Sequence, residues 1–218
     1  MTLLSISGAC SRSGKTAAAV SLLRALPAGR AAAVKFTTTE DVFERCPRGT
    51  PCVVCDIDVP FRIVEDAAVL DDAGTDTARL REAGASPVVW AIARESSVAS
   101  AWAAVQRRLA GADVVIMEGS TIVSVARPDL QVFVAHPWLS PDRWKGTSAA
   151  CVARADVVIV NRPGSDARPP SPEVLDALRR LGGPEPIVAD VTRPPSEWAP
   201  KLTRALVRAG ERVAAVRA

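Results

Sequence analysis

Residues 3–16 decide the fold of this chain; they read Leu3-Leu4-Ser5-Ile6-Ser7-Gly8-Ala9-Cys10-Ser11-Arg12-Ser13-Gly14-Lys15-Thr16. The apolar run Leu3–Ile6 predicts a strand, and an Ala/Leu-rich run that opens on Gly14-Lys15-Thr16 and stops at Pro27 predicts a helix. A loop of small residues joins the two. A strand, such a loop and a helix that begins with Gly-Lys-Thr are the context of a phosphate-binding loop.

Backbone N–H groups of such a loop and the positive end of its helix cradle polyphosphate oxygens. Lys15 is expected to reach the β- and γ-phosphates and act in catalysis, and the Thr16 hydroxyl is expected to bind Mg²⁺. The loop has the spacing G-x5-G-K-T, one residue longer than the usual motif. The sequence therefore predicts a Mg²⁺-dependent site for ATP or GTP. The expected nucleotide contacts are Gly8, Cys10, Ser11, Arg12, Ser13, Gly14, Lys15, Thr16 and Ala17.

Apolar, β-branched runs alternate with helical patterns along the chain. Strands are predicted at Leu3–Ser7, Ala32–Phe36, Cys52–Ile57, Pro87–Ala93, Val114–Met117, Leu130–Ala135, Val157–Val160 and Pro186–Val191. Helices are predicted at Thr16–Leu26, Thr75–Ala83, Val98–Leu109, Thr147–Ala153, Pro172–Leu181 and Glu197–Ala209. This alternation predicts an α/β fold: a doubly wound, mostly parallel sheet of about seven or eight strands flanked by helices. We expect one domain over 1–218.

Composition excludes several classes of protein. A net charge of +3 is too small to indicate a nucleic-acid partner. No apolar stretch approaches the ~20 residues of a membrane span, and the first residues lack the apolar core of a signal peptide. We therefore expect a cytoplasmic protein with neither a membrane nor a nucleic-acid partner. Structural disulfides among its five cysteines are then not expected.

Two acidic strand ends are candidates for holding Mg²⁺ and for catalysis. Val114–Gly119 is an apolar strand that ends in Glu118 and a glycine, whose backbone N–H could approach the γ-phosphate. Asp56 and Asp58 follow Cys55 and share a face by strand alternation. The alternative for each is a solvated acid. We expect Thr16, Asp56 and Glu118 to hold Mg²⁺, with Asp56 and Glu118 also catalytic.

Asn161 and Arg162 follow a late apolar strand, where an asparagine commonly reads the nucleotide base. The guanine-specifying pattern Asn-Lys-x-Asp is not met, so the base stays open between adenine and guanine. The hydroxyls of Thr37, Thr38 and Thr39 end the second predicted strand and could bind Mg²⁺ or a substrate, or form a plain polar turn.

Cys46, Cys52 and Cys55 form a cluster within ten residues. Three thiolates could ligate zinc or an iron–sulfur cluster, with a fourth ligand from Cys10 or across a dimer axis. The competing interpretation is that these cysteines pack as small apolar residues in a buried strand.

On the basis of four of its segments, the chain resembles the molybdopterin-guanine dinucleotide biosynthesis protein B family. The resemblance rests on the phosphate loop, the strand end Val34–Thr39, the segment Gly74–Ala85 and the strand that ends in Glu118-Gly119. Gly74–Ala85, which reads GTDTARLREAGA, is the most specific of these. Residues 40–70, which carry the cysteines, look like an insertion relative to that family.

The resemblance implies a P-loop NTPase fold of the class shared with dethiobiotin synthetase and nitrogenase iron protein, a homodimer, and a nucleotide-bound Mg²⁺. It implies hydrolysis in aid of cofactor assembly or metal insertion, with an assembly enzyme or a pterin-type ligand as partner. In Gly74–Ala85, Asp76 could cap the helix and Arg79 could contact a phosphate or pterin. Hydrolysis is expected to be slow without a partner, because no arginine finger can be assigned from the sequence; Arg12 in the loop is a candidate, in cis or across a dimer.

Two other functions stay open at this point. The G-x5-G-K-T spacing resembles that of dethiobiotin synthetase, which favours an ATP-dependent ligase or kinase that acts on a small acid. A nucleotide-gated metallochaperone would instead use the cysteine cluster to carry its cargo.

Overall fold

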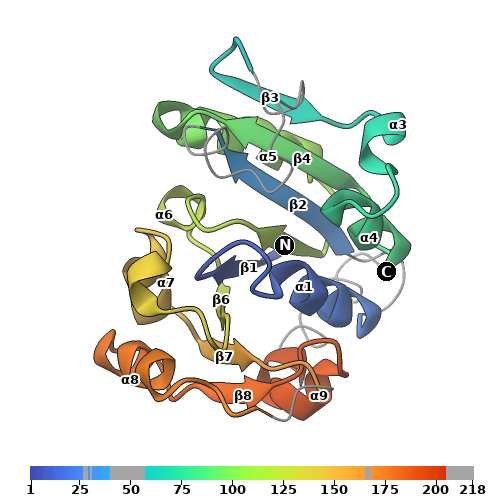
Figure 1. Ribbon diagram of the computed structural model, residues 1–218. Coiled ribbons are helices and arrows are strands. Elements are labelled where there is room, and N and C mark those ends of the chain that lie inside the picture. Colours follow the sequence, from blue (N-terminus) through green and yellow to red (C-terminus); the bar gives the residue numbers. More distant parts are fainter. Residues whose placement is uncertain (27–28, 30, 40–56, 165–167, 205–218) are drawn as a thin grey trace.

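The computed structural model describes residues 1–26, 29, 31–39, 57–164 and 168–204. Its described residues contain an eight-stranded sheet in the order β3-β4-β2-β5-β1-β6-β7-β8 (Figure 1). All neighbouring strands pair in parallel except the edge strand β3, which runs antiparallel to β4. The strands are β1 Thr2–Gly8, β2 Ala31–Thr38, β3 Phe61–Val64, β4 Val88–Ala93, β5 Val114–Glu118, β6 Leu130–Ala135, β7 Val157–Asn161 and β8 Ile187–Ala189.

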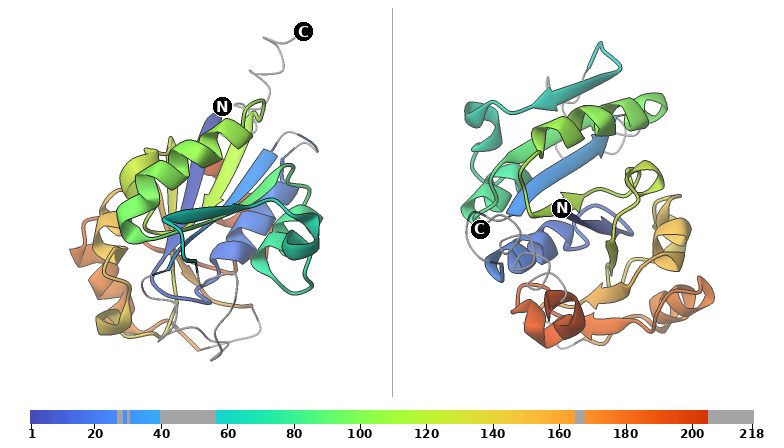
Figure 2. Two further views of the ribbon diagram at one scale, coloured as in Figure 1. Left: turned by 90° about the horizontal axis from the view of Figure 1, so that it is seen from above. Right: turned by 180° about the vertical axis from the view of Figure 1, so that it is seen from behind.

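Helices cover both faces of this sheet, as the view from above shows (Figure 2). Helices α1, α4 and α9 pack on one face, and α5, α7 and α8 pack on the other. Central strands are buried on both faces, which is why they read as unbroken apolar runs. The helices are α1 Lys15–Arg24, α3 Ala67–Leu70, α4 Asp76–Glu82, α5 Val98–Arg108, α6 Val123–Ala126, α7 Ser148–Ala153, α8 Pro172–Arg180 and α9 Pro195–Trp198, with 3₁₀ turns η1 Glu95–Ser97 and η2 Pro141–Arg143.

The predicted fold class is confirmed, and most predicted elements are present within two residues of their predicted bounds. Strand β3 was missed, because four residues after Pro60 give too short an apolar pattern to stand out. The predicted strand Cys52–Ile57 lies outside the described residues up to position 56, and so does the predicted helix Glu197–Ala209 beyond position 204. Within the described residues, no helix combines the length and the apolar character that crossing a bilayer requires.

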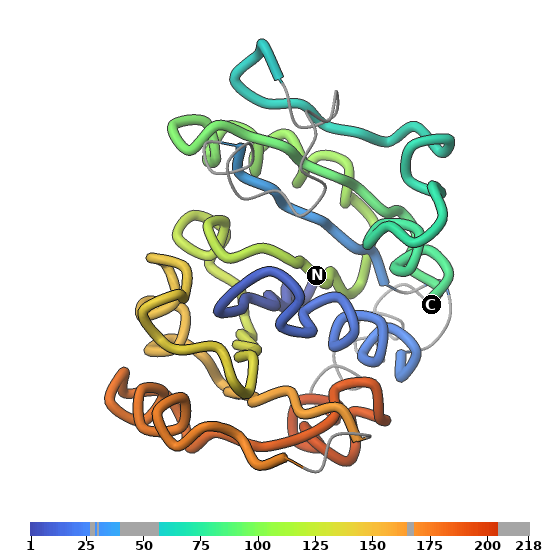
Figure 3. Tube along the Cα trace, viewed as in Figure 1, coloured from blue at the N-terminus to red at the C-terminus, as the bar shows by residue number. Residues whose placement is uncertain are grey.

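The topology brings three strand ends together around the phosphate loop. Strand β1 lies between β5 and β6, and β2 lies on the far side of β5. The chain leaves β1 at Gly8, turns through the loop and enters α1 (Figure 3). Because ligands of parallel sheets bind beyond the carboxyl ends of the strands, this edge is where a site is expected.

Candidate functional site

Two glycines allow the phosphate loop to close on itself. A Cβ at Gly8 would lie 2.6 Å from the Ser13 Oγ and 2.8 Å from the Val134 carbonyl oxygen. Gly14 precedes α1 with a φ of +106°, and a Cβ there would overlap the Asn161 amide. A side chain at either position would force the loop open, so both glycines of the motif are required by its geometry.

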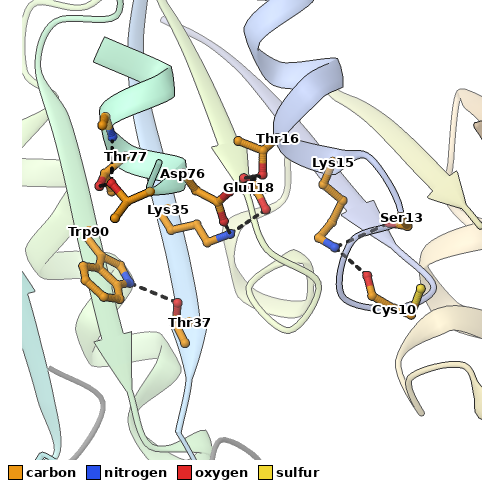
Figure 4. A network of polar contacts seen from close by, with 12 residues as sticks. Cys10, Ser13, Lys15, Thr16, Lys35, Thr37, Asp76, Thr77, Trp90 and Glu118 are labelled. Atoms are coloured by element: carbon orange, nitrogen blue, oxygen red, sulfur yellow. Dashed lines mark hydrogen bonds and ion pairs between the residues drawn. The ribbon is translucent and has the colours of Figure 1, made fainter. Parts of the chain in front are cut away.

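Lys15 lies over the loop that it is expected to serve. Its Nζ donates to the Cys10 carbonyl oxygen at 2.7 Å and contacts the Ser13 Oγ at 3.5 Å (Figure 4). Burial lowers the pKa of Lys15 to about 8, and the Glu118 carboxylate only partly opposes this. A buried ammonium held by one carbonyl gains an ionic partner when an anion enters the loop.

The Thr16 hydroxyl lies between two carboxylates from different elements. Its Oγ1 is 2.9 Å from the Asp76 Oδ1 on α4 and 2.8 Å from the Glu118 Oε2 at the end of β5 (Figure 4). One hydroxyl carries one proton, so it can donate to only one of two ionised carboxylates at a time. The Thr16 hydroxyl therefore has one hydrogen for two carboxylate oxygens, and one of the two oxygens accepts no hydrogen bond from it.

This oxygen group fits Mg²⁺. Magnesium prefers octahedral oxygen ligands at about 2.1 Å, which places adjacent ligand atoms about 3 Å apart. The two measured separations, 2.9 and 2.8 Å, match that spacing. Thr16, Asp76 and Glu118 are therefore the described residues that could hold the cation.

Lys35 places an ammonium between the same two carboxylates. Its Nζ is 2.5 Å from the Asp76 Oδ2 and 2.6 Å from the Glu118 Oε1 (Figure 4). Lys35 and Glu118 are register partners on the neighbouring strands β2 and β5, which is why their side chains meet. With Glu118 only 2% exposed, Lys35 supplies the cation that a buried carboxylate needs.

The charges of Lys35 and Asp76 each favour the ionised state of the other. Burial is the largest influence on the pKa of Lys35 and lowers it, but Glu118 and Asp76 together raise it above its ordinary value. For Asp76, burial raises the pKa, and Lys35, the Thr16 hydrogen bond and Arg79 outweigh it, so the pKa is lowered. Asp76 is thus an ionised oxygen donor at neutral pH.

Several predicted site residues lie away from this oxygen group or outside the described residues. Asp56, Cys46, Cys52 and Cys55 lie outside the described residues, so their roles stay predictions. Asp58 points to solvent with its side chain 90% exposed. Among the described residues, no group of three or more His, Cys, Asp or Glu side chains could hold a metal.

The Gly119 backbone N–H donates to the Ile6 carbonyl oxygen at 3.1 Å, so the expectation that this N–H meets a phosphate is wrong for this conformation.

The remaining residues of the phosphate loop differ in exposure: Ser11 and Arg12 are exposed, Cys10 and Ala17 are half-buried, and Ser13 is buried. Arg12 has a φ of 60°, a left-handed conformation at the outer turn of the loop. Its role as an arginine finger stays a prediction.

Asn161 ties the phosphate loop to the segment after β8. Its Nδ2 donates to the Ser13 carbonyl oxygen at 3.1 Å, and its Oδ1 accepts from the Val191 N–H at 3.3 Å. One amide hydrogen and one lone pair remain, so a base contact stays a prediction. The Arg162 N–H donates to the Ala189 carbonyl oxygen at 2.8 Å, and the base contact expected of Arg162 also stays a prediction.

Sequence reasoning missed Lys35 and Asp76 as members of the Mg²⁺ group. Asp76 was expected to cap α4, but the Thr75 Oγ1 does so by accepting from the Ala78 N–H at 3.2 Å. This leaves the Asp76 carboxylate free to face Thr16. A threonine followed by an aspartate at a helix start was the available signal, since the first can cap and the second can serve a site.

A cavity of about 380 Å³ adjoins the site between α1, α4 and the segment after β8. Ala17, next to Thr16, lines it, and so do Arg24, Arg79 and Thr192. Neither arginine forms an ion pair with a carboxylate in the described part of the chain. The cavity therefore runs along α1, from Ala17 near the phosphate loop to Arg24 at the end of the helix.

No protein-family model and no curated protein sequence matches this chain. Two solved structures resemble its fold. HypB from Helicobacter pylori in complex with nickel aligns with a TM-score of 0.50 and 14% identity, over 97% of this chain and 88% of that one. The septum site-determining protein MinD from Pyrococcus horikoshii OT3, complexed with Mg-ADP, aligns with a TM-score of 0.40 and 17% identity, over 97% and 95%. With its phosphate loop and its mostly parallel eight-stranded sheet, the chain has the fold of the P-loop NTPases.

Proposed function

We propose that this chain binds the Mg²⁺ complex of a nucleoside triphosphate, ATP or GTP, and hydrolyses it. One observation carries the proposal: the Thr16 hydroxyl next to Lys15 is shared by two carboxylates at 2.8 and 2.9 Å. A phosphate loop alone would support anion binding only. Oxygen donors with Mg²⁺ spacing at the helix start support a triphosphate with its metal.

The residues would divide the chemistry as follows. The loop N–H groups and Lys15 bind the phosphate chain, and Lys15 exchanges the Cys10 carbonyl for a phosphate oxygen. Thr16, Asp76 and Glu118 would hold Mg²⁺, which when bound neutralises charge on the transferring phosphoryl group. Lys35 pairs with both carboxylates through its ammonium. A carboxylate oxygen of Glu118 or Asp76 orients the attacking water.

The test is phosphate release from ATP and from GTP, each with Mg²⁺ or with a chelator. Wild-type protein should release phosphate only with Mg²⁺, and Lys15→Ala should lower the rate at least about 100-fold by removing a charge on the transferring group. Lys201→Ala, an exposed lysine after α9, is the matched control. A Lys15→Ala protein that binds nucleotide as tightly as the parent and turns over at the same rate would sink the proposal.

We further propose that hydrolysis aids cofactor assembly or metal insertion. This rests on the Gly74–Ala85 resemblance, which also implies a homodimer, and on Cys46, Cys52 and Cys55 as zinc or iron–sulfur ligands. Anaerobically purified protein should then contain zinc or iron, and the triple serine variant should lose it. If wild type contains neither metal and the triple variant behaves identically, the cysteines carry no cargo.

A second candidate function is an ATP-dependent ligase or kinase that acts on a small acid. The cavity that runs along α1 from Ala17 favours it, because Arg24 and Arg79 line it together with Glu82 and could bind a carboxylate there. Product analysis with ATP and small carboxylic acids separates the two functions. Formation of ADP with an acyl phosphate supports transfer to the acid, whereas acid-independent phosphate release supports hydrolysis.

A further inference from the structure

Lysine is rare in this chain, and its positions are informative. Of 27 basic side chains only four are lysines: Lys15, Lys35, Lys145 and Lys201. Lys15 and Lys35 belong to the site already described. An ammonium is a compact charge with three freely rotating donors, whereas a guanidinium is a rigid, planar fork. Most basic residues of this chain are arginines, and Lys145 is a further lysine whose main chain contacts the phosphate loop.

The main chain fixes Lys145 against the phosphate loop. Lys145 lies between η2 and α7, and its N–H donates to the Ala9 carbonyl oxygen at 2.8 Å. The Ala9 N–H in turn donates to the Val134 carbonyl oxygen at 3.1 Å, and the Ser148 N–H donates to the Lys145 carbonyl oxygen at 2.8 Å. Backbone hydrogen bonds therefore join the loop after β6 to the first turn of the phosphate loop.

Trp144 supports the hydrogen-bonded connection between the segment after β6 and the phosphate loop. Its indole Nε1 donates to the Leu139 carbonyl oxygen at 3.0 Å, and its ring lies 6.4 Å from that of Phe133 in a tilted arrangement. Phe133 is fully buried in β6. This aromatic anchor helps to fix the main chain directly before Lys145.

The charge of Lys145 acts on groups inside the loop. Burial raises the pKa of Cys10, and the charges of Lys15, Lys145 and Arg143 oppose that rise. Lys145 is exposed, and the Ala9 carbonyl that accepts from its N–H directly precedes Cys10, whose own carbonyl oxygen accepts from the Lys15 Nζ at 2.7 Å. An anion in the loop would attract both ammonium groups.

The geometry points to Lys145 as a third lysine of the nucleotide site, whose ammonium contacts the terminal phosphoryl group on the flank of the loop away from Asp76 and Glu118. This inference rests on the proposed function. The terminal group is assigned because the Lys15 Nζ, which serves the β- and γ-phosphates, lies at the Cys10 carbonyl, and Cys10 follows Ala9, whose carbonyl accepts from the Lys145 N–H. Lys145 comes from the same chain, so a single protomer carries this charge.

The test compares Lys145→Gln with Lys201→Gln, since both remove one exposed ammonium. The Lys145 anchor to Ala9 is a backbone hydrogen bond, so the substitution leaves it in place. With Mg²⁺ and a non-hydrolysable triphosphate analogue, Lys145→Gln should raise Kd about tenfold, roughly the loss of one charge-assisted phosphate contact. The Kd for the diphosphate should change less than about threefold, and Lys145→Arg should recover part of the loss.

Three outcomes would overturn the inference. If Lys145→Gln binds and turns over like Lys201→Gln while wild type binds triphosphate, Lys145 has no role and the proposed function stands. If diphosphate and triphosphate affinities fall equally, Lys145 contacts the inner phosphates and the assignment is wrong. If wild type binds neither nucleotide, the proposed function fails first and this inference fails with it.

Discussion

The two flanks of the phosphate loop differ in the charge and the burial of their side chains. On the flank of β2, β5 and α4, two carboxylates, one ammonium and one hydroxyl contact each other directly, and Glu118 is 2% exposed. On the flank of the loop after β6, Arg143 and Lys145 are exposed, and the hydrogen bond that joins this segment to the loop comes from the main chain. One flank is a closed group in which one ammonium is shared by two carboxylates, and the other is an open surface that carries two exposed basic side chains.

This difference indicates which part of a nucleotide each flank serves. Oxygen donors packed at Mg²⁺ spacing suit a cation, and they need one when they are buried. Exposed cations suit the anionic end of a phosphate chain, which arrives from solvent and leaves again. The buried flank therefore bears on stability as well as on binding, whereas the exposed flank should affect binding alone.

The largest effect on stability is expected from Lys35→Met. The substitution leaves Asp76 and the buried Glu118 without their shared ammonium, which should lower the free energy of unfolding by about 3–5 kcal/mol in metal-free buffer. Arg81→Met is the control, because Arg81 pairs with Asp71 at 3.0 Å on the exposed surface and should cost less than about 1 kcal/mol. Urea unfolding measures both. Equal stability of the two variants would show that Lys35 does not neutralise the buried pair.

Mg²⁺ with nucleotide should change the stability of Lys35→Met and of Arg81→Met by different amounts. A cation in the oxygen group should restore part of the stability that Lys35→Met loses, since it replaces the missing charge. Arg81→Met should gain no more from Mg²⁺ and nucleotide than wild type gains.

A smaller effect with a defined pH dependence is expected from Lys15→Met. Burial lowers the pKa of Lys15 from 10.5 to about 8. Below pH 8 the folded protein bears the full cost of the buried charge, and as the pH rises towards 10.5 that cost disappears, because the folded state releases its proton first. Lys15→Met should therefore be more stable than wild type by about 1–3 kcal/mol at pH 7, and the gap should close near pH 10.5. A gap that stays constant across this range would show that burial of the charge is not its cause.

The sequence was sufficient for the elements whose signal is local. The phosphate loop, Glu118 at the end of β5 and the alternation of strands and helices follow from patterns within a few residues. Asp76 could not be assigned in this way, because its place beside Thr16 depends on how α4 packs against α1, 60 residues away in sequence. Lys35 reads as one polar residue in an apolar strand, and only the β2–β5 register shows that it faces Glu118. Contacts of this kind depend on tertiary geometry, which no local pattern contains.

Thr16, Asp76 and Glu118 are proposed to hold the divalent cation of a bound nucleotide. Electron paramagnetic resonance of Mn²⁺, titrated into the complex with a non-hydrolysable triphosphate, tests it most directly. Asp76→Asn and Glu118→Gln should each weaken Mn²⁺ binding at least about tenfold, since each removes a charged oxygen ligand. Asp58→Asn, which alters an exposed carboxylate outside the group, should leave it unchanged. If all three variants bind Mn²⁺ as wild type does, the oxygen group is not the metal site.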